Sequence, residues 1–334
     1  MLPPPEHVEH ILIWHNGALG DLLLAGPALT AIRRYYHRSR LTGVGHPECW
    51  RLLQEVLSLE AVWDAGASLW SRLFTQGELP AFLAERLSGF SLALVFTPRP
   101  SHDFLSRLRQ AGVRRVLWIP SFSENGREPV RTLQARHLAE LGLAYEPEPL
   151  HLPVAAGENE PLPAGLPGNQ PLLTVAPGSG HAKKNWPLSH YFEVTRTLAW
   201  EFDLQVAWLA GPAELSWLPY LQGLARSQGQ TLVAGLPLSQ VARVLALTRL
   251  YLGGDSGITH LAVATGARDV LALFGPTDPK VWAPFGGNLT LLTAPGDCVP
   301  CTAGRDITCE APICLRNLSP EKVLQVAVAL LSGR

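Results

Sequence analysis

The chain has 334 residues and a formal net charge of −1, and 47% of its residues are hydrophobic against 16% charged. This length allows two domains with sizeable cores, the composition excludes a disordered chain, and the nearly neutral charge argues against general nucleic-acid binding. The sequence starts without a signal-peptide pattern and has no run of about 18 apolar residues, so we expect a cytoplasmic protein without a membrane span.

Strands and helices alternate in the first half of the sequence. Residues 10–15 (HILIWH) predict a buried strand. A loop with Gly17 and Gly20 follows, and then a helix over 22–31 in which Pro27 should introduce a kink or delay the start of the regular helix. Further strands are predicted at 41–45, 92–96 and 113–119, with helices over 47–57 and 103–110. This order predicts an α/β domain with a mostly parallel sheet.

Asp21 stands at the start of the first helix, after the short loop that follows the first strand. This position is the carboxyl edge of the sheet, where open α/β sheets bind their ligands. An acid that only compensates the helix dipole would occupy the same place, so position alone leaves both interpretations open. At the other end of the helix, Arg33, Arg34, Arg38 and Arg40 form a basic cluster. The dipole alone favours such a cluster, and contact with an anionic lipid surface is the second interpretation.

A domain boundary is predicted where the pattern of elements lapses, over residues 145–171. This stretch holds seven prolines and three glycines, too many breakers for the interior of a helix or strand. We predict an N-terminal domain over 1–150, a linker over 151–171, a second domain over 172–319, and a C-terminal helical segment over 320–334 that could pack back on the first domain.

The second half repeats the alternation, with strands predicted at 172–176, 205–210, 231–234 and 270–274. A loop of small residues, 177–180, follows the first of these strands. Farther on, the Gly253-Gly254 turn ends another strand, and Asp255 and Ser256 can cap the helix that follows. Such a turn offers free N–H groups and a helix dipole to an anion. On its own, however, the turn is more typical of an ordinary βαβ unit.

Taken together, these segments resemble family 9 of the glycosyltransferases, the bacterial lipopolysaccharide heptosyltransferases. The marks of that family stand in the right order along nearly the whole chain. They are Gly20-Asp21, Pro177-Gly178, Lys184-Asn185-Trp186-Pro187, Asp255-Ser256-Gly257-Ile258-Thr259-His260 and Phe274-Gly275-Pro276-Thr277. Each motif is weak alone, but the combination is specific. The resemblance implies the GT-B architecture, in which two facing Rossmann-like domains with mostly parallel sheets hold the active site between them.

The resemblance also implies an activity: the inverting transfer of a heptose or related sugar from a nucleotide diphosphate donor, typically ADP-heptose. The acceptor would be a hydroxyl of the lipopolysaccharide core, a lipid-linked or oligosaccharide partner at the cytoplasmic face of the inner membrane. Reversible membrane contact would accompany this role, and no nucleic acid would take part.

The residue roles are likewise implied by the resemblance. It makes Asp21 the general base and brings Lys184 to the donor phosphates. The further donor-binding residues that it implies are Ser179, Gly180, Glu214, Leu236, Asp255, Ser256, Gly257 and His260. The acceptor side would be formed by His15, Gly17 and Gly20.

The chemistry of sugar transfer agrees with these roles. A positioned carboxylate base typically contributes ~10²–10⁴-fold to such a reaction. The departing nucleoside diphosphate gains negative charge, which a lysine, loop N–H groups and a helix N-terminus can stabilise without a metal cofactor. One position departs from the family pattern, because His15 stands where Arg or Lys is usual, six residues before Asp21. Histidine is only partly charged near neutral pH, so the acceptor could differ from the standard acidic inner-core sugar.

Four of the five cysteines lie late in the chain, at Cys298, Cys301, Cys309 and Cys314. Four thiols spaced C-x2-C-x7-C-x4-C could hold a structural zinc ion. A disulfide or free thiols are the alternatives, since cytoplasmic thiols are usually reduced. No catalytic role is expected for them.

Two other functions are compatible with the sequence. A sugar-nucleotide 2-epimerase shares the architecture but needs further acid–base groups around the donor sugar. A non-catalytic nucleotide-sugar binding protein would not need both Asp21 and Lys184, and their presence together speaks against it.

Overall fold

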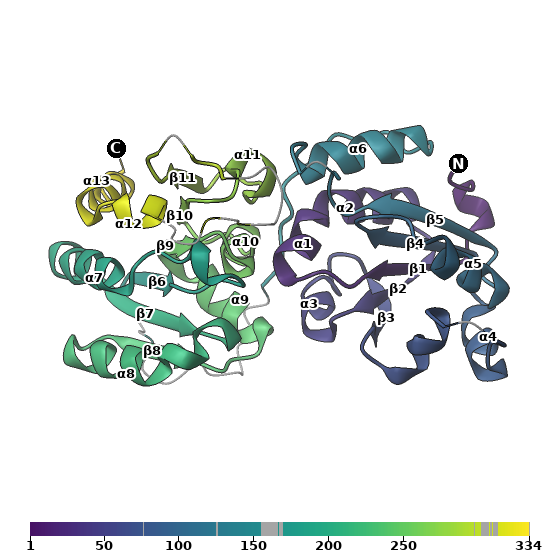
Figure 1. Cartoon of the computed structure of the whole chain (residues 1–334), viewed down its shortest axis with the longest axis horizontal. Coiled ribbons are helices and arrows are strands. Elements are labelled where there is room, and N and C mark those ends of the chain that lie inside the picture. The colour runs from purple at the N-terminus through teal and green to yellow at the C-terminus, as the bar shows by residue number, and fades with distance from the viewer. Residues whose placement is uncertain are drawn as a thin grey trace. The chain divides into compact units, whose positions relative to one another are not determined.

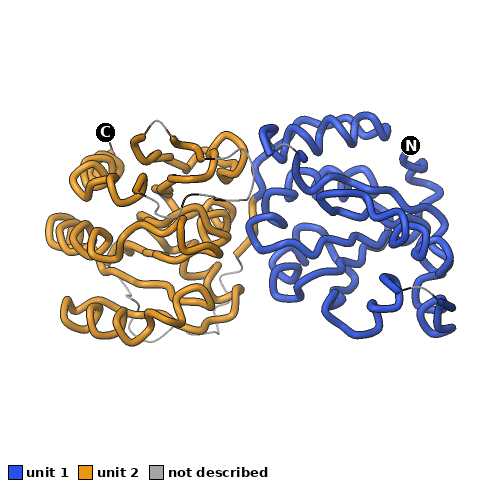
Figure 2. The backbone as a smooth tube through the Cα atoms, viewed as in Figure 1, with its two compact units in different colours: residues 1–150 blue, residues 151–334 orange. Residues whose placement is uncertain are grey.

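The computed structural model describes residues 1–75, 77–124, 126–154, 166, 170–296, 298–301, 307, 309 and 313–333. The chain divides into two compact units, Met1–Leu150 (unit 1) and His151–Arg334 (unit 2), shown in Figure 2. The division falls after Leu150, and most of the predicted linker over 151–171 lies outside the described residues.

Unit 1 is built on a five-stranded parallel sheet with the order β3-β2-β1-β4-β5 (Figure 1). The strands are β1 (His10–His15), β2 (Arg40–Gly45), β3 (Leu59–Asp64), β4 (Leu92–Thr97) and β5 (Arg115–Pro120). The helices are α1 (Leu19–Leu24), α2 (Gly26–Tyr35), α3 (Pro47–Leu52), α4 (Ala81–Leu87), α5 (His102–Gln110) and α6 (Val130–Glu140), with 3-10 turns η1 (Pro5–His7) and η2 (Ser68–Leu73). Strand order reverses between β1 and β4, because β2 and β3 lie on one side of β1 and the later strands on the other.

The helix predicted over 22–31 is two helices in the structure. α1 ends at Leu24, and α2 begins at Gly26 with Pro27 in its first turn. Proline is tolerated there because the first N–H groups of a helix have no partner within it, so Pro27 restarts the helix instead of bending it. Strand β3 is not predicted from the sequence, since this edge strand is only partly buried and carries Glu60 and Asp64.

Unit 2 holds a six-stranded parallel sheet with the order β11-β10-β9-β6-β7-β8. The strands are β6 (Leu172–Ala176), β7 (Gln205–Ala210), β8 (Thr231–Ala234), β9 (Thr248–Gly254), β10 (Asp269–Phe274) and β11 (Leu289–Thr293). The helices are α7 (Leu188–Phe202), α8 (Leu218–Ser227), α9 (Leu238–Ala246), α10 (Gly257–Ala264), α11 (Pro279–Trp282), α12 (Ile313–Asn317) and α13 (Pro320–Leu331), with 3-10 turns η3 (Ala182–Lys184) and η4 (Pro212–Trp217). Here strand order reverses between β6 and β9.

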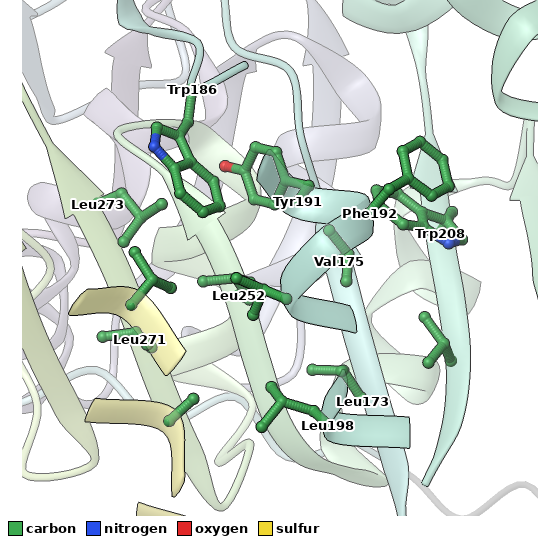
Figure 3. Packing of buried hydrophobic residues seen from close by; sticks show 14 of the residues in the cluster. Leu173, Val175, Trp186, Tyr191, Phe192, Leu198, Trp208, Leu252, Leu271 and Leu273 are labelled. Carbon is green, nitrogen blue, oxygen red and sulfur yellow. The ribbon is translucent and has the colours of Figure 1, made fainter. Parts of the chain in front are cut away.

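Large aromatic side chains pack between α7 and this sheet (Figure 3). Trp186 meets Tyr191 edge-on with ring centroids 4.8 Å apart, and Phe192 stacks on Trp208 at 4.2 Å. The buried indole of Trp186 donates to the carbonyl of Leu318, at 2.8 Å. The tryptophan of the Lys-Asn-Trp-Pro motif is therefore a core residue that fixes the motif on unit 2.

The C-terminal helix packs against elements of unit 2. α13 lies against α7 within unit 2, and Val323 and Ala327 are fully buried in the core there. Arg249 at the start of β9 donates to the carbonyls of Leu330 and Leu331. The apolar face of α13 is thus used to cover the sheet of its own unit. Among the described residues, no helix is long and apolar enough to cross a membrane.

Candidate active site

The candidate residues of unit 2 gather at the point where its strand order reverses. The loop 177–180 and η3 follow β6, whereas Asp255 and Ser256 follow β9. β6 and β9 are hydrogen-bonded neighbours, so their carboxyl ends lie together at one edge of the sheet. In open α/β sheets, this reversal point is where ligands bind.

An ion pair joins these two loops. Lys184 Nζ lies 3.0 Å from Asp255 Oδ2, with the Lys184 side chain 21% exposed and that of Asp255 10%. Thr277 donates its hydroxyl to the same carboxylate oxygen, at 2.8 Å. A carboxylate this buried is expected to be paired and hydrogen-bonded, since desolvation of an isolated charge is costly. Lys184 and Asp255 are therefore held in a defined geometry at the edge of the sheet.

Glycine makes the close approach of the two loops possible. A Cβ on Gly254 would lie 3.2 Å from the carbonyl oxygen of Lys184, a contact tighter than most side chains tolerate. Because Gly254, the last residue of β9, has no side chain, η3 can pack directly against it.

Ser179 is buried and directed at its own loop. Its hydroxyl lies 2.7 Å from Asn185 Oδ1 and 2.9 Å from the carbonyl of His181, and it donates to either acceptor. In the same turn, His181 Nδ1 accepts from the backbone N–H of Lys183. Ser179 and Asn185 therefore shape the loop that presents Lys184. Gly180 is exposed, and a Cβ there would meet nothing within 4 Å.

Glu214 lies inside the protein, 5% exposed, in η4 after β7. Its Oε2 accepts from the backbone N–H of Gly211 at 2.8 Å. A Cβ on Gly178 would sit only 2.1 Å from Oε1, so the carboxylate lies directly against the Pro177-Gly178 loop. Burial raises the pKa of this carboxyl, and the backbone N–H groups of Gly211, Gly178 and Glu214 itself partly offset the rise. Glu214 thus ties together the loops that follow β6 and β7.

The turn before α10 is organised by side-chain hydrogen bonds. Ser256 caps the helix by accepting from the backbone N–H of Thr259. The Thr259 hydroxyl lies 2.9 Å from the buried hydroxyl of Tyr251 and also bonds the carbonyl of Gly254. The predicted cap is confirmed, and Gly257 is the first residue of α10. His260 is buried on the same helix at 6% exposure. Leu236 lies half-buried between β8 and α9.

The unit 1 candidates lie at the carboxyl end of β1. The backbone N–H of Gly17 donates to His15 Nδ1 at 3.3 Å, and that of Ala18 donates to Asp21 Oδ2 at 3.2 Å. A Cβ on Gly17 would approach His15 to 2.8 Å and the Asp21 carboxylate to 3.1 Å, so glycine is required where these two side chains converge. Gly20 lies within α1. Asp21 is half-buried and follows β1 at the reversal point of its own sheet.

Two residues of this geometry are given no role by the sequence alone. Thr277 ends the Phe-Gly-Pro-Thr motif, and Asn185 stands at the variable position of Lys-x-Trp-Pro. The position of Thr277 in the turn that follows β10, the neighbour of β9, is the signal that locates it beside Asp255.

The basic cluster at the end of α2 is largely engaged within the protein. Arg33 donates to the carbonyls of Ser39 and Tyr36. Arg34 pairs with Glu148 at 2.7 Å, and Arg40 with Glu60 at 3.4 Å. These contacts favour a structural role over a dedicated lipid-binding patch.

The late cysteines are all free thiols. Burial raises the pKa of the Cys301 thiol to about 11, and Cys309, Cys314 and Cys298 add to the rise. The donor set suits zinc. In the part of the chain that the structure describes, however, no group of three or more potential ligands has the arrangement of a metal site.

The segment that carries the late cysteines, between Cys298 and Cys314 (the cysteine segment), also contacts the candidate site through Cys301 and Ile307. The N–H of Cys301 donates to the carbonyl of Pro276 at 2.9 Å, and Lys183 Nζ donates to the carbonyl of Ile307 at 3.1 Å. It therefore braces both the turn that carries Thr277 and the turn that carries Lys184.

Comparison with known proteins adds to this geometry. A family model described as glycosyltransferase family 9 (heptosyltransferase) matches residues 127–310. Lipopolysaccharide heptosyltransferase 1 of Pseudomonas aeruginosa is 27% identical over 186 residues, which is about half of either protein: 48% of this chain and 48% of the relative. Lipooligosaccharide heptosyltransferase 2 of Campylobacter jejuni is 22% identical over 97% of this chain and 98% of its own length.

The fold has a solved counterpart. The structure of the Escherichia coli ADP-heptose lipopolysaccharide heptosyltransferase II matches with a TM-score of 0.74 and 21% identity, over 97% of this chain and 99% of that one. The α/β class with two mostly parallel sheets is confirmed by the strand pairing, and the GT-B architecture by this likeness.

Proposed function

Because the chain belongs to glycosyltransferase family 9, we propose that this protein transfers a heptose from ADP-heptose to a hydroxyl of the lipopolysaccharide core or a related glycan. The observation that carries this proposal is the meeting of Lys184, Asp255 and Thr277 at the strand reversal of unit 2. The names of the relatives support the choice of sugar and nucleotide, because the two curated relatives named above are heptosyltransferases and the E. coli enzyme is described with ADP-heptose.

Unit 2 supplies the donor side of the proposed reaction. Lys184 carries three N–H donors, of which one is directed at Asp255, and the others suit phosphate oxygens. The N-terminus of α10 adds backbone N–H groups and a helix dipole that favour an anion. As the bond between the anomeric carbon and the phosphate oxygen breaks, these groups stabilise the charge of the leaving diphosphate.

Unit 1 supplies the base. The acceptor oxygen attacks the anomeric carbon on the face opposite the leaving diphosphate, which inverts the configuration there. Its proton passes to the Asp21 carboxylate, which α1 and the Ala18 N–H hold at the end of β1. Because the core acceptor is lipid-linked, the enzyme would work in the cytoplasm, in reversible contact with the inner membrane surface.

The test is calorimetric binding of ADP, UDP, GDP and CDP to the wild type, to Lys184→Ala and to Lys322→Ala. Lys322 lies on α13 and serves as the control for removing a lysine from the same unit. Selective ADP binding that is lost only in Lys184→Ala supports the proposal. A preference for UDP moves the substrate to another sugar, and binding of none of the four contradicts the donor site.

The turnover assay then separates the enzyme classes. Release of ADP from ADP-heptose that depends on added core acceptor is expected for a transferase. Conversion of the nucleotide-sugar without any acceptor would favour the epimerase instead. Binding without turnover would favour a non-catalytic protein.

A further inference from the structure

The Lys184–Asp255 pair places a fixed negative charge beside the lysine of the donor site. The lysine nitrogen and the carboxylate oxygen are 3.0 Å apart, and the Asp255 side chain is 10% exposed. Thr277 holds the same carboxylate oxygen from the turn after β10, at 2.8 Å. The carboxylate is therefore held by contacts from two loops, and it stays beside Lys184 when an anion approaches the lysine.

The neighbouring lysine, Lys183, is hydrogen-bonded to a different segment. Lys183 Nζ donates to the carbonyl of Ile307, in the cysteine segment. Asp255 thus partly cancels the positive charge of Lys184 at the place where a diphosphate would be held, and an anion meets a weaker attraction than the lysine alone would offer.

Donor and product differ in charge at the phosphate that leaves the sugar. In a nucleotide-sugar each phosphate has one ester and one anhydride linkage, and so carries one negative charge. When the sugar leaves, the terminal phosphate gains a second ionisation with a pKa of about 6, as in phosphate monoesters. Near pH 7.5 the product therefore carries almost one more negative charge than the donor.

We propose that Asp255 is a specificity-determining residue that disfavours the nucleoside diphosphate product relative to the nucleotide-sugar donor, and so promotes product release. This inference rests on the proposed function, since it needs a diphosphate at Lys184. The fixed carboxylate repels the additional charge of the product, whereas the donor with its lower charge is repelled less. Lys184 attracts both ligands, and Asp255 sets the difference between their affinities.

The experiment measures the affinity of ADP and of ADP-ribose, a probe with the lower charge, for Asp255→Asn. The amide oxygen can still accept from Lys184 and Thr277, so the substitution removes the charge and retains the contacts. At pH 7.5 we expect the Kd of ADP to fall by about tenfold and that of ADP-ribose by no more than about threefold. Asp255→Ser also removes the charge and is measured in parallel in case Asp255→Asn folds poorly.

Asp269→Asn is the matched control. Asp269 is an ion-paired carboxylate of the same unit, held by Arg249, but it starts β10 at the amino edge of the sheet. Neither Kd should change in this variant.

Three results decide the inference. Weaker or unchanged ADP binding in both Asp255 variants overturns it, and Asp255 then only positions Lys184. An equal fall in the Kd of ADP and of ADP-ribose also overturns it, because the charge of Asp255 would then not discriminate between the two ligands. Failure of the wild type to bind either ligand contradicts the proposed function itself, and is thus told apart from failure of the inference.

Discussion

Gly178 and Glu214 are in such close contact that a Cβ on Gly178 would lie 2.1 Å from the Glu214 carboxylate. The two residues follow neighbouring strands, β6 and β7, and their contact joins the loops at the carboxyl edge of the unit 2 sheet. The Pro-Gly motif thus has a packing explanation that is independent of any ligand.

Gly178→Ala should destabilise the protein. The added methyl group must displace a buried carboxylate, and overpacking of this kind costs about 1–3 kcal/mol. A lower thermal midpoint in calorimetry checks this. Gly180→Ala, two residues away in open space, is the control and should leave the midpoint within error. Equal midpoints for the two variants would show that the loop can shift at no cost.

Glu214 should make the free energy of unfolding depend on pH. Its pKa in the folded protein lies above the ordinary 4.5, because burial disfavours the charged form. The folded state then holds the proton more tightly, so the contribution of Glu214 is favourable below pH 4.5 and is lost as the pH rises through the folded pKa. Each unit of pKa difference corresponds to about 1.4 kcal/mol.

Urea unfolding of the wild type and of Glu214→Gln between pH 4 and 8 measures this effect. The wild type should lose stability relative to the variant as the pH rises. Glu193→Gln, on the exposed face of α7, controls for removal of a charge and should run parallel to the wild type. Parallel curves for Glu214→Gln as well would contradict the expectation.

Asp21→Asn should abolish most turnover and retain donor binding. The amide can still accept from the Ala18 N–H but cannot take the acceptor proton, so kcat should fall by ~10²–10⁴-fold. Steady-state kinetics gives kcat, and calorimetry gives the Kd of the nucleotide. Turnover close to that of the wild type would remove Asp21 from the role of base.

The cysteine segment should couple a bound metal to the donor site. If Cys298, Cys301, Cys309 and Cys314 hold zinc, the purified protein carries about one equivalent that a chelator removes. Removal should loosen the contacts of Cys301 with Pro276 and of Lys183 with Ile307, and so weaken ADP binding by several-fold. Metal content by mass spectrometry and calorimetry before and after chelation provide the measurement. If the purified protein contains no metal and still binds ADP normally, the thiols are free side chains without a metal-binding role.

The sequence predicts the buried strands of both sheets because their apolar runs are uninterrupted. It does not predict β3, whose partly exposed residues lack such a run. Strand ends also place Asp21 and Asp255 at the carboxyl edges of the sheets, because the loop after a parallel strand begins there. Lys184 stands farther along the loop after β6 and is singled out only by the resemblance. The pairing of Lys184 with Asp255 could not be read from the chain, because it depends on β6 lying next to β9 in the sheet.

Side-chain roles are less accessible from sequence than positions. The resemblance gives Glu214 and Ser179 a donor-binding role, and only the structure shows that each of them also bonds to its own loop. Trp186 belongs to a motif that suggests a site, and it is a core residue. Burial and partner distances, which depend on tertiary packing, separate these cases.

The placement of α13 within unit 2 bears on how the protein can be divided for experiments. A fragment cut at residue 319, the end of the predicted second domain, would lack Val323 and Ala327 and would expose the apolar side of α7 to solvent. We expect such a fragment to be recovered from cells as aggregate, and one that extends through Leu331 to be recovered in soluble form.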